Sequence, residues 1–174
     1  NVIPSLYWGF GNTFTYKNWD LDVFIYSQLG VDKYNDVYSW TSGRGLGNQT
    51  NNMSVYIKDV WHSELNPNGT IPGIAYEMAS VSLPGGAGTD IGYENSSFVR
   101  VRNITLGYNF KPNQLGALSK LLSGIRVYVD VQNPFTFTGY TGLDPEVNTG
   151  GNYKGGKAEY PQTRTCSLGA KLSF

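Results

Sequence analysis

Cysteine and histidine are almost absent from this sequence of 174 residues, which contains one of each. Cys166 has no second cysteine with which to form an internal disulfide or a metal cluster. His62 and Glu64 form an H-x-E pair, but one histidine without further ligands at suitable spacing makes a poor metal site. Because the sequence shows no pairing of a nucleophile with a base, we expect no enzyme, no catalytic residues and no cofactor.

Long hydrophobic runs and an excess of either charge are also missing. No stretch of about 18 apolar residues is present, which excludes a transmembrane helix. The mean hydropathy of -0.32 would suit a soluble chain, but the strands of a membrane barrel escape such a measure because their apolar residues alternate with polar ones. Thirteen basic and 13 acidic residues leave no net charge, so no overall positive field would attract nucleic acid.

Glycine and aromatic residues are abundant by comparison. The chain contains 22 glycines and 13 tyrosines, and 14% of its residues are aromatic, which favours β structure. Hydrophobic residues make up 40% and charged residues 15%, a balance that excludes a disordered chain.

The final stretch, residues 162–174, shows the pattern most clearly. Every second residue from Cys166 to Phe174 is apolar, and this two-residue period predicts a strand. The strand closes on an aromatic residue, so we interpret Phe174 as a signal for the barrel-assembly machinery of a membrane barrel. A soluble sheet whose last strand happens to end the chain stays open as an alternative.

The same alternation predicts about five strands, near residues 5–16, 19–30, 96–110, 124–133 and 162–174. Their connections differ greatly in length. Lys17 and Asn18 form a tight hairpin turn, and residues 111–123 make a moderate connection with one or two helical turns. Residues 31–95 and 134–161 are long and irregular, apart from a short helix predicted near residues 53–61.

Two such long connections count against a compact soluble domain, where loops are typically a few residues. They suit an outer-membrane barrel, whose long loops all lie on the external side. About five strands cannot close a membrane barrel, since the smallest need about eight. We therefore expect an all-β chain that forms the last strands of a larger antiparallel transmembrane barrel, with the missing strands upstream of Asn1 or in another chain.

Several motifs carry a resemblance to a known family. They are FVRVRNITLGY at residues 98–108, VQNPF at residues 131–135, GLDPE at residues 142–146 and the closing strand to Phe174. In this order they resemble the C-terminal part of SusC/RagA-type TonB-dependent transporters, and the resemblance covers nearly the whole chain. It implies a cell outer membrane location, a barrel of about 22 strands and an N-terminal plug that is not in this chain.

The resemblance also implies a function and partners. Such transporters import oligosaccharides or peptides, together with a SusD-like surface lipoprotein that closes over the external mouth. TonB would act through the N-terminal region that this chain lacks. Two alternatives stay open: a TonB-dependent receptor for iron chelates, and a secreted carbohydrate-binding β-sandwich.

Side-chain parity assigns the two faces of each predicted strand. The apolar face gains about 25 cal/mol for each Å² that moves from water into lipid, so it should face outward. The polar face should then line the lumen and either hold the plug or touch the passing solute. Its members are Tyr7, Asp20, Asp22, Tyr26, Arg126, Tyr128, Asp130 and Gln132.

Ligand contacts are more readily expected in the external loops, because rings that stack on sugars or peptides need exposure. The candidates are Tyr38, Trp40, Trp61 and Tyr76, and the alternative is that these rings pack the loops together. Asp144 and Glu146 could bind Ca²⁺, but a turn is the simpler interpretation of the Asp-Pro-Glu sequence.

Three arginines break the apolar parity. Arg100, Arg102 and Arg164 share the outward face, where a charge at the bilayer midplane would cost roughly 2–4 kcal/mol. We therefore expect them near the external rim, in contact with lipopolysaccharide phosphates. The alternative is a shift of register around Val99 and Val101 that turns Arg100 and Arg102 inward.

Overall fold

The structure, a computed structural model, describes residues 2–35, 54–70, 92–147 and 160–174. The chain divides into two compact units. One unit comprises residues 3–31, 97–139 and 162–174, and the other comprises residues 1–2, 32–96 and 140–161. Among the described residues, no helix is both long and apolar enough to cross a membrane.

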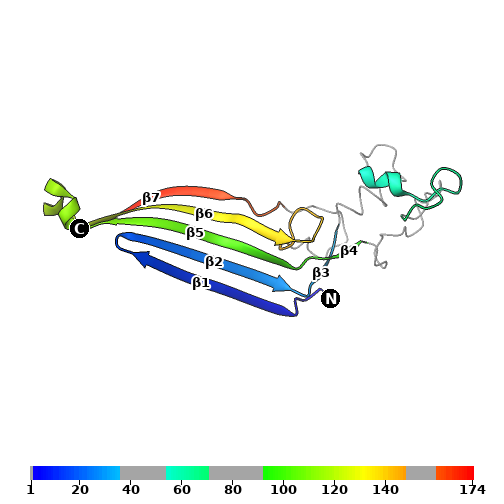
Figure 1. Cartoon of the computed structure of the whole chain (residues 1–174), viewed down its shortest axis with the longest axis horizontal. Coiled ribbons are helices and arrows are strands. Elements are labelled where there is room, and N and C mark those ends of the chain that lie inside the picture. The colour runs from blue at the N-terminus through cyan, green and yellow to red at the C-terminus, as the bar shows by residue number, and fades with distance from the viewer. Residues whose placement is uncertain (1, 36–53, 71–91, 148–159) are drawn as a thin grey trace. The chain divides into compact units, whose positions relative to one another are not determined.

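The first unit is a single antiparallel sheet of five strands in the order β1-β2-β5-β6-β7 (Figure 1). This confirms the predicted all-β antiparallel fold. The strands are β1 (Leu6–Tyr16), β2 (Trp19–Leu29), β5 (Phe98–Phe110), β6 (Gly124–Thr138) and β7 (Thr165–Ser173). In the described chain the sheet is open, with β1 and β7 at its two edges.

Short connections join the strands at one end of the sheet. Lys17 has a φ of 57°, a value that a two-residue hairpin turn requires at its first position, and it connects β1 to β2. The short 3-10 helices η4 (Pro112–Gln114) and η5 (Gly116–Lys120) connect β5 to β6. These connections lie at the end of the sheet where the C terminus lies (Figure 1).

A double irregularity interrupts the ladder near the opposite end of the sheet. Between β2 and β5, Phe24 pairs with Asn103 and Ile25 with Val101, so Arg102 is an extra residue in β5. Between β5 and β6, Asn103 pairs with Gln132 and Val101 with Phe135. Two residues of β6, Asn133 and Pro134, therefore lie opposite the single residue Arg102 of β5. Bulges of this kind change which face the following side chains occupy.

The bulge in β6 contains Asn133 and Pro134. Asn133 has a φ of 50°, a left-handed conformation that asparagine tolerates better than most residues. Pro134 lacks a backbone N–H, and a bulge is one of the few strand positions that do not need one. The strand therefore runs through this proline to Thr138, beyond the range of 124–133 expected from alternation.

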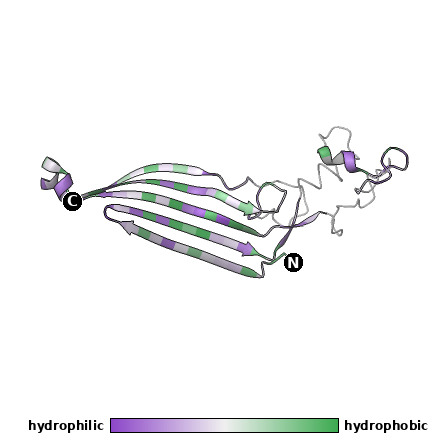
Figure 2. Ribbon diagram, viewed as in Figure 1, coloured by the Kyte–Doolittle hydropathy of each residue, from purple (hydrophilic) through white to green (hydrophobic). Residues whose placement is uncertain are grey.

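Because the bulges shift the register, the sheet keeps one apolar face along its length. Figure 2 shows the bands of hydrophobic and hydrophilic residues along the strands. This face carries Leu6, Trp8, Phe10, Phe14, Tyr16, Trp19, Leu21, Val23, Ile25, Val99, Val101, Ile104, Leu106, Tyr108, Ile125, Val127, Val129, Val131, Phe135, Phe137, Cys166, Leu168, Ala170 and Leu172. The polar exceptions are Asn12, which pairs with Val23, and Ser27. The buried hydroxyl of Ser27 donates to the Phe98 carbonyl oxygen at 2.7 Å, so it presents no unpaired group on this face.

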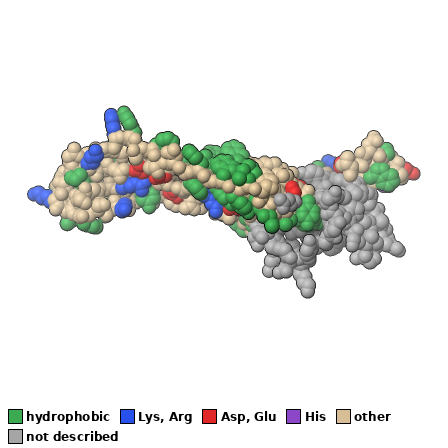
Figure 3. Space-filling model, turned by 90° about the horizontal axis from the view of Figure 1, so that it is seen from below, with side chains coloured by type: hydrophobic (Ala, Val, Ile, Leu, Met, Phe, Trp, Pro, Cys, Tyr) green, Lys and Arg blue, Asp and Glu red, His purple; other side chains and the backbone are tan. Residues whose placement is uncertain are grey.

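Much of the apolar face is exposed. Phe137 is 63% exposed and Leu168 is 77% exposed, and hydrophobic side chains are visible on the surface of the sheet in Figure 3. The β-sandwich alternative requires a second large sheet packed against this face. Among the described residues, the other sheet has only two strands. On a protein in water, an exposed apolar patch of this size would promote aggregation. In a bilayer the same side chains contact the hydrocarbon of the lipid.

The second unit contains a small antiparallel pair, β3 (Asp32–Tyr34) and β4 (Tyr93–Asn95), within the connection from β2 to β5. Tyr34 packs edge-on against Tyr93 across this pair, with ring centroids 5.3 Å apart. The same connection contains the 3-10 helix η3 (Val55–Asp59), which lies inside the range predicted as a short helix. This long connection is therefore not wholly irregular.

The extra residue in β5 generates a prediction. Deleting Val101 should place Arg102 opposite Ile25 on the apolar face, at a cost of up to roughly 2–4 kcal/mol in lipid. We expect the deletion, made in the complete protein that contains this sheet, to reduce the fraction of heat-modifiable barrel on a detergent gel. The matched control is the deletion of Arg102, which removes the extra residue but leaves Val101 and Arg100 on their present faces, and should assemble normally. Equal assembly of the two variants would contradict the role given to the bulge.

Candidate functional site: the polar face of the sheet

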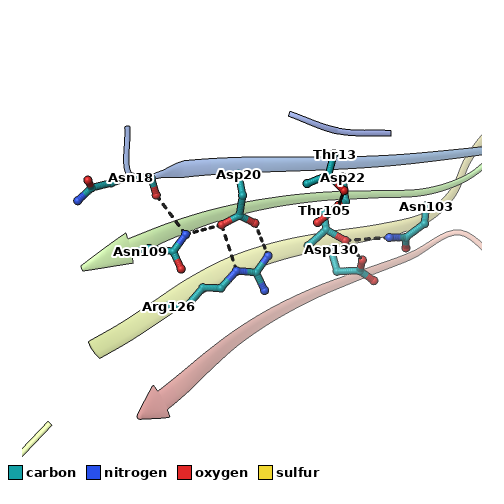
Figure 4. A network of polar contacts seen from close by, with 9 residues as sticks. All are labelled: Thr13, Asn18, Asp20, Asp22, Asn103, Thr105, Asn109, Arg126 and Asp130. Carbon is teal, nitrogen blue, oxygen red and sulfur yellow. Dashed lines mark hydrogen bonds and ion pairs between the residues drawn. The ribbon is translucent and has the colours of Figure 1, made fainter. Parts of the chain in front are cut away.

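The opposite face of the sheet carries a network of polar side chains from four strands. Figure 4 shows Thr13, Asn18, Asp20, Asp22, Asn103, Thr105, Asn109, Arg126 and Asp130 on this face. Four of the residues that parity assigned to the lumen face take part in it, namely Asp20, Asp22, Arg126 and Asp130.

The central contact is an ion pair that crosses a strand. Asp20 lies in β2 and Arg126 in β6, with β5 between them. The Arg126 Nε donates to Asp20 Oδ1 at 3.2 Å and its Nη2 donates to Asp20 Oδ2, which makes the pair bidentate. Asn109 Nδ2 also donates to Asp20 Oδ1, at 2.5 Å. Paired donors of this kind fix both the position and the orientation of the carboxylate.

Glycine in β5 makes this crossing possible. Gly107 is the residue of β5 that pairs with Asp20, and the ion pair lies directly over it. A Cβ at this position would lie 2.6 Å from Asp20 Oδ2 and 2.7 Å from Arg126 Nε. Such distances are well inside van der Waals contact, so a side chain here would push the two charged groups apart.

A second glycine extends the arrangement to β7. The ring of Tyr128 lies over Gly169, where a Cβ would be 2.4 Å from the ring. The Arg126 guanidinium lies 5.0 Å from the centroid of the same ring, within the range of a cation–π contact. Asp20, Arg126 and Tyr128 therefore form a continuous band that crosses from β2 to β7, which we call the polar rib.

The remaining carboxylates of the face are also paired within the wall. Thr13 donates its hydroxyl to Asp22. Thr105 donates to Asp130 Oδ1 at 2.6 Å, and Gln132 Nε2 donates to Asp130 Oδ2 at 3.3 Å. These charges thus have hydrogen-bond donors within the wall before any ligand or other domain approaches.

The rest of the polar face, beyond the bulges, is built around Arg100. Its side chain is 1% exposed, and its Nε donates to Thr136 Oγ1 at 2.9 Å. The guanidinium lies 5.3 Å from the centroid of Phe98, whose ring packs edge-on against Tyr26. Tyr26, Arg100 and Thr136 are aligned in the register, so all three share the polar face.

This placement differs from the expected outward orientation of Arg100 towards lipopolysaccharide. The cause is the extra residue Arg102, which reverses the parity of the segment before it, as in the alternative register considered from the sequence. A buried guanidinium that donates to Thr136 does not have the exposure that a lipopolysaccharide contact needs. Arg102 is half-buried and Arg164 is exposed, so the rim expectation is kept for these two residues alone.

None of the four aromatic residues expected to contact ligand lies in the polar face of the sheet as the structure describes it. Tyr38, Trp40 and Tyr76 lie outside the described residues. Trp61 is 48% exposed and follows η3 in a loop that is braced by its own side chains. Asn66 Nδ2 donates to two backbone carbonyl oxygens of this loop.

The side chains considered as weak metal ligands stabilise turns of the backbone. His62 Nδ1 accepts hydrogen bonds from the backbone N–H groups of Glu64 and Leu65, at 3.2 and 3.1 Å. Asp144 Oδ1 accepts from the Glu146 backbone N–H at 2.8 Å, as in an Asx turn. Within the described part of the chain, no group of three or more His, Cys, Asp or Glu side chains could hold a metal ion.

Sequence reasoning missed the two glycines and four of the polar partners. Thr13, Asn103, Thr105 and Asn109 have the same parity as the predicted lumen residues, so alternation could have included them. Gly107 and Gly169 have that parity too, but a glycine in a strand gives no sign of which neighbouring side chain covers it.

No protein family model matches the chain. It is 31% identical to TonB-dependent receptor P3 of Formosa agariphila over 98% of its length, and 33% identical to TonB-dependent receptor SusC of Bacteroides thetaiotaomicron over 95%. It spans 16% and 15% of these two proteins. The chain thus corresponds to a small section of the curated relatives it matches.

Solved structures are also similar to this chain over nearly its whole length, and the chain again spans only a small part of each. The RagAB peptide importer in the closed-closed state matches 99% of this chain and 18% of its own chain, with a TM-score of 0.78 and 25% identity. The open-open state of the same importer matches 99% of this chain and 17% of its own, with a TM-score of 0.72 and 24% identity.

An exposed apolar face and a self-paired polar face define the wall of an outer-membrane β-barrel protein. Within that class, the chain belongs to the family of SusC/RagA-type TonB-dependent proteins, as its motifs indicated. Its relatives are receptors and transporters rather than enzymes, in agreement with the sequence.

The polar rib generates a second prediction. Gly107→Ala should separate Asp20 from Arg126 and lower the stability of the complete barrel by about 1–3 kcal/mol, as overpacking commonly does. Thermal unfolding in detergent, followed by the loss of heat-modifiable mobility, measures the effect. Gly11→Ala is the matched control, because it lies on the same face and its Cβ would be 3.5 Å from Phe24, an ordinary contact. If both variants unfold at the same temperature as the parent protein, the polar rib does not contribute to the stability of the barrel.

Proposed function

We propose that this chain forms the C-terminal strands of a large TonB-dependent barrel that imports nutrient oligosaccharides or peptides across the outer membrane. The observation that carries the proposal is the five-stranded sheet with one exposed apolar face and one paired polar face, in a chain related to SusC along almost its whole length. A barrel wall is the structure in which both faces of one sheet meet a suitable environment.

The open edges of the sheet support a longer barrel. Within lipid, each unpaired backbone group costs several kcal/mol, so β1 and β7 need further strands beside them. Such strands would come from the part of the transporter that corresponds to the rest of its relatives' length. A plug and a TonB-contacting segment would lie in that part as well.

The partners follow from the same proposal. A SusD-like surface lipoprotein would cover the external mouth, and TonB would supply energy from the periplasmic side. Phe174 would serve the barrel-assembly machinery, while the apolar face would contact outer-membrane lipid. Arg102 and Arg164 would meet lipopolysaccharide phosphates near the rim, where their cost in lipid is low.

The polar face would serve mainly to seat the plug. Its charged groups are already engaged with one another, as Asp20 is with Arg126 and Asp130 with Thr105. A surface of paired charges can contact another protein domain without leaving a charge unpaired when that domain shifts. The external loops, including Trp61 and the undescribed Tyr38, Trp40 and Tyr76, would make the contacts with solute.

Energy-dependent uptake tests the proposed function. Bacteria that depend on the complete transporter should take up labelled oligosaccharides or peptides, and a protonophore should reduce uptake to the level of cells without the transporter. The same loss is expected when the gene for TonB is deleted, because binding alone does not drive import. A small solute that enters through porins is the control and should be unaffected. Uptake that persists without the proton gradient would refute the proposal.

A further inference from the structure

A cluster of interacting side chains in the second unit joins three segments that lie far apart in the sequence. The segments are residues 32–35, 92–96 and 140–147, so the cluster links the connection after β2 to the connection after β6. We call this cluster the loop clasp, and its members are Lys33, Asn35, Glu94, Tyr140, Thr141 and Asp144.

Glu94 is the centre of the loop clasp. Its Oε1 accepts from Asn35 Nδ2 at 2.9 Å, and Thr141 Oγ1 donates to the same carboxylate at 2.8 Å. Its Oε2 accepts from the Thr141 backbone N–H, also at 2.9 Å. Asn35 Nδ2 lies 3.1 Å from Thr141 Oγ1 as well, so the three residues form a closed triangle. One carboxylate therefore holds a side chain from each of the other two segments.

Lys33 makes a second link. Its Nζ donates to the Asp144 backbone carbonyl oxygen at 3.0 Å and lies 5.5 Å from the centroid of the Tyr140 ring. The ring packs over Gly142, where a Cβ would lie 2.4 Å from it. The Asx turn at Asp144 then fixes the path of the chain beyond the ring. Residues 140–146 are thus held at both of their ends.

Three members of the clasp are buried, whereas Glu94 is half-buried and Thr141 is exposed. Asn35 is 2% exposed, Asp144 is 6% exposed and Tyr140 is 9% exposed. A buried polar group that loses its partner keeps the full penalty of its desolvation. Separating any one segment would break several of these contacts at once, so we expect the three segments to separate together.

We propose that the loop clasp stays closed throughout the transport cycle and that its three segments move as one rigid body. This inference rests on the proposed function, because it concerns the cycle of an importer. The clasp residues are then positioning residues that keep two external connections in one arrangement.

Paired cysteines test whether the closed clasp is needed. Asn35→Cys and Thr141→Cys, in the complete transporter with Cys166→Ala, remove all three side-chain contacts of the triangle and place thiols where 3.1 Å now separates two polar atoms. In the reduced state the uptake of labelled solute should fall well below that of the Cys166→Ala parent. A short bifunctional methanethiosulfonate should bridge the thiols and restore uptake, and a reductant should reverse the restoration.

Each other outcome overturns the inference. Normal uptake in the reduced state would mean that the clasp is dispensable. Uptake that the bridge abolishes, and that a reductant restores, would mean that the clasp must open. A pair that the reagent fails to bridge in the folded barrel would mean that the two segments do not lie together.

Protease sensitivity tests the clasp without any reference to transport. Tyr34, Tyr93 and Tyr140 are chymotrypsin sites within the three segments. Glu94→Gln replaces an acceptor with an amide that cannot accept from all three donors, and cleavage of the folded barrel should become roughly tenfold faster. Glu64→Gln is the matched control, since this exposed carboxylate lies outside the clasp.

The two tests separate the two proposals. If the parent transporter shows no energy-dependent uptake while Glu94→Gln is still cleaved faster than Glu64→Gln, the proposed function fails and the clasp stands as a structural brace. If uptake is energy-dependent while Glu94→Gln and Glu64→Gln are cleaved at equal rates, the clasp inference fails and the proposed function stands.

Discussion

The alternation of apolar and polar side chains is the constraint on which the rest of this sheet depends. A single layer of strands has two faces, and each face needs a solvent that suits it. The apolar face is exposed along all five strands, while the polar face pairs its charges within the wall. Both observations follow if lipid lies on one side and a water-filled lumen on the other.

The bulges at Arg102 and at Asn133–Pro134 show how strictly this constraint is kept. Simple alternation would turn Val99 and Val101 towards the lumen and Arg100 towards lipid. One extra residue in β5, and a further one in β6, restore the apolar face and bury Arg100 beside Thr136. The chain accepts an irregular ladder because a charge in lipid would cost more than a local loss of pairing.

Glycine has a complementary role on the polar face. Gly107 and Gly169 leave space that long side chains from neighbouring strands fill, so Arg126 and Tyr128 lie along the wall. The result is a band of contacts between residues on different strands rather than a row of side chains that project into the lumen. In the second unit, Gly142 accepts the ring of Tyr140 in the same way.

The sequence by itself determined the β class, the ranges of most strands and the two faces, because side-chain parity is a local property of an extended chain. It also carried the motifs of the SusC/RagA type. Only the tertiary structure decided the face of Arg100, the partner of Asp20 and the joining of Glu94 to Thr141. The physical reason is that a bulge, a glycine space and a contact between distant segments each depend on which strand lies next to which, and no local pattern specifies that.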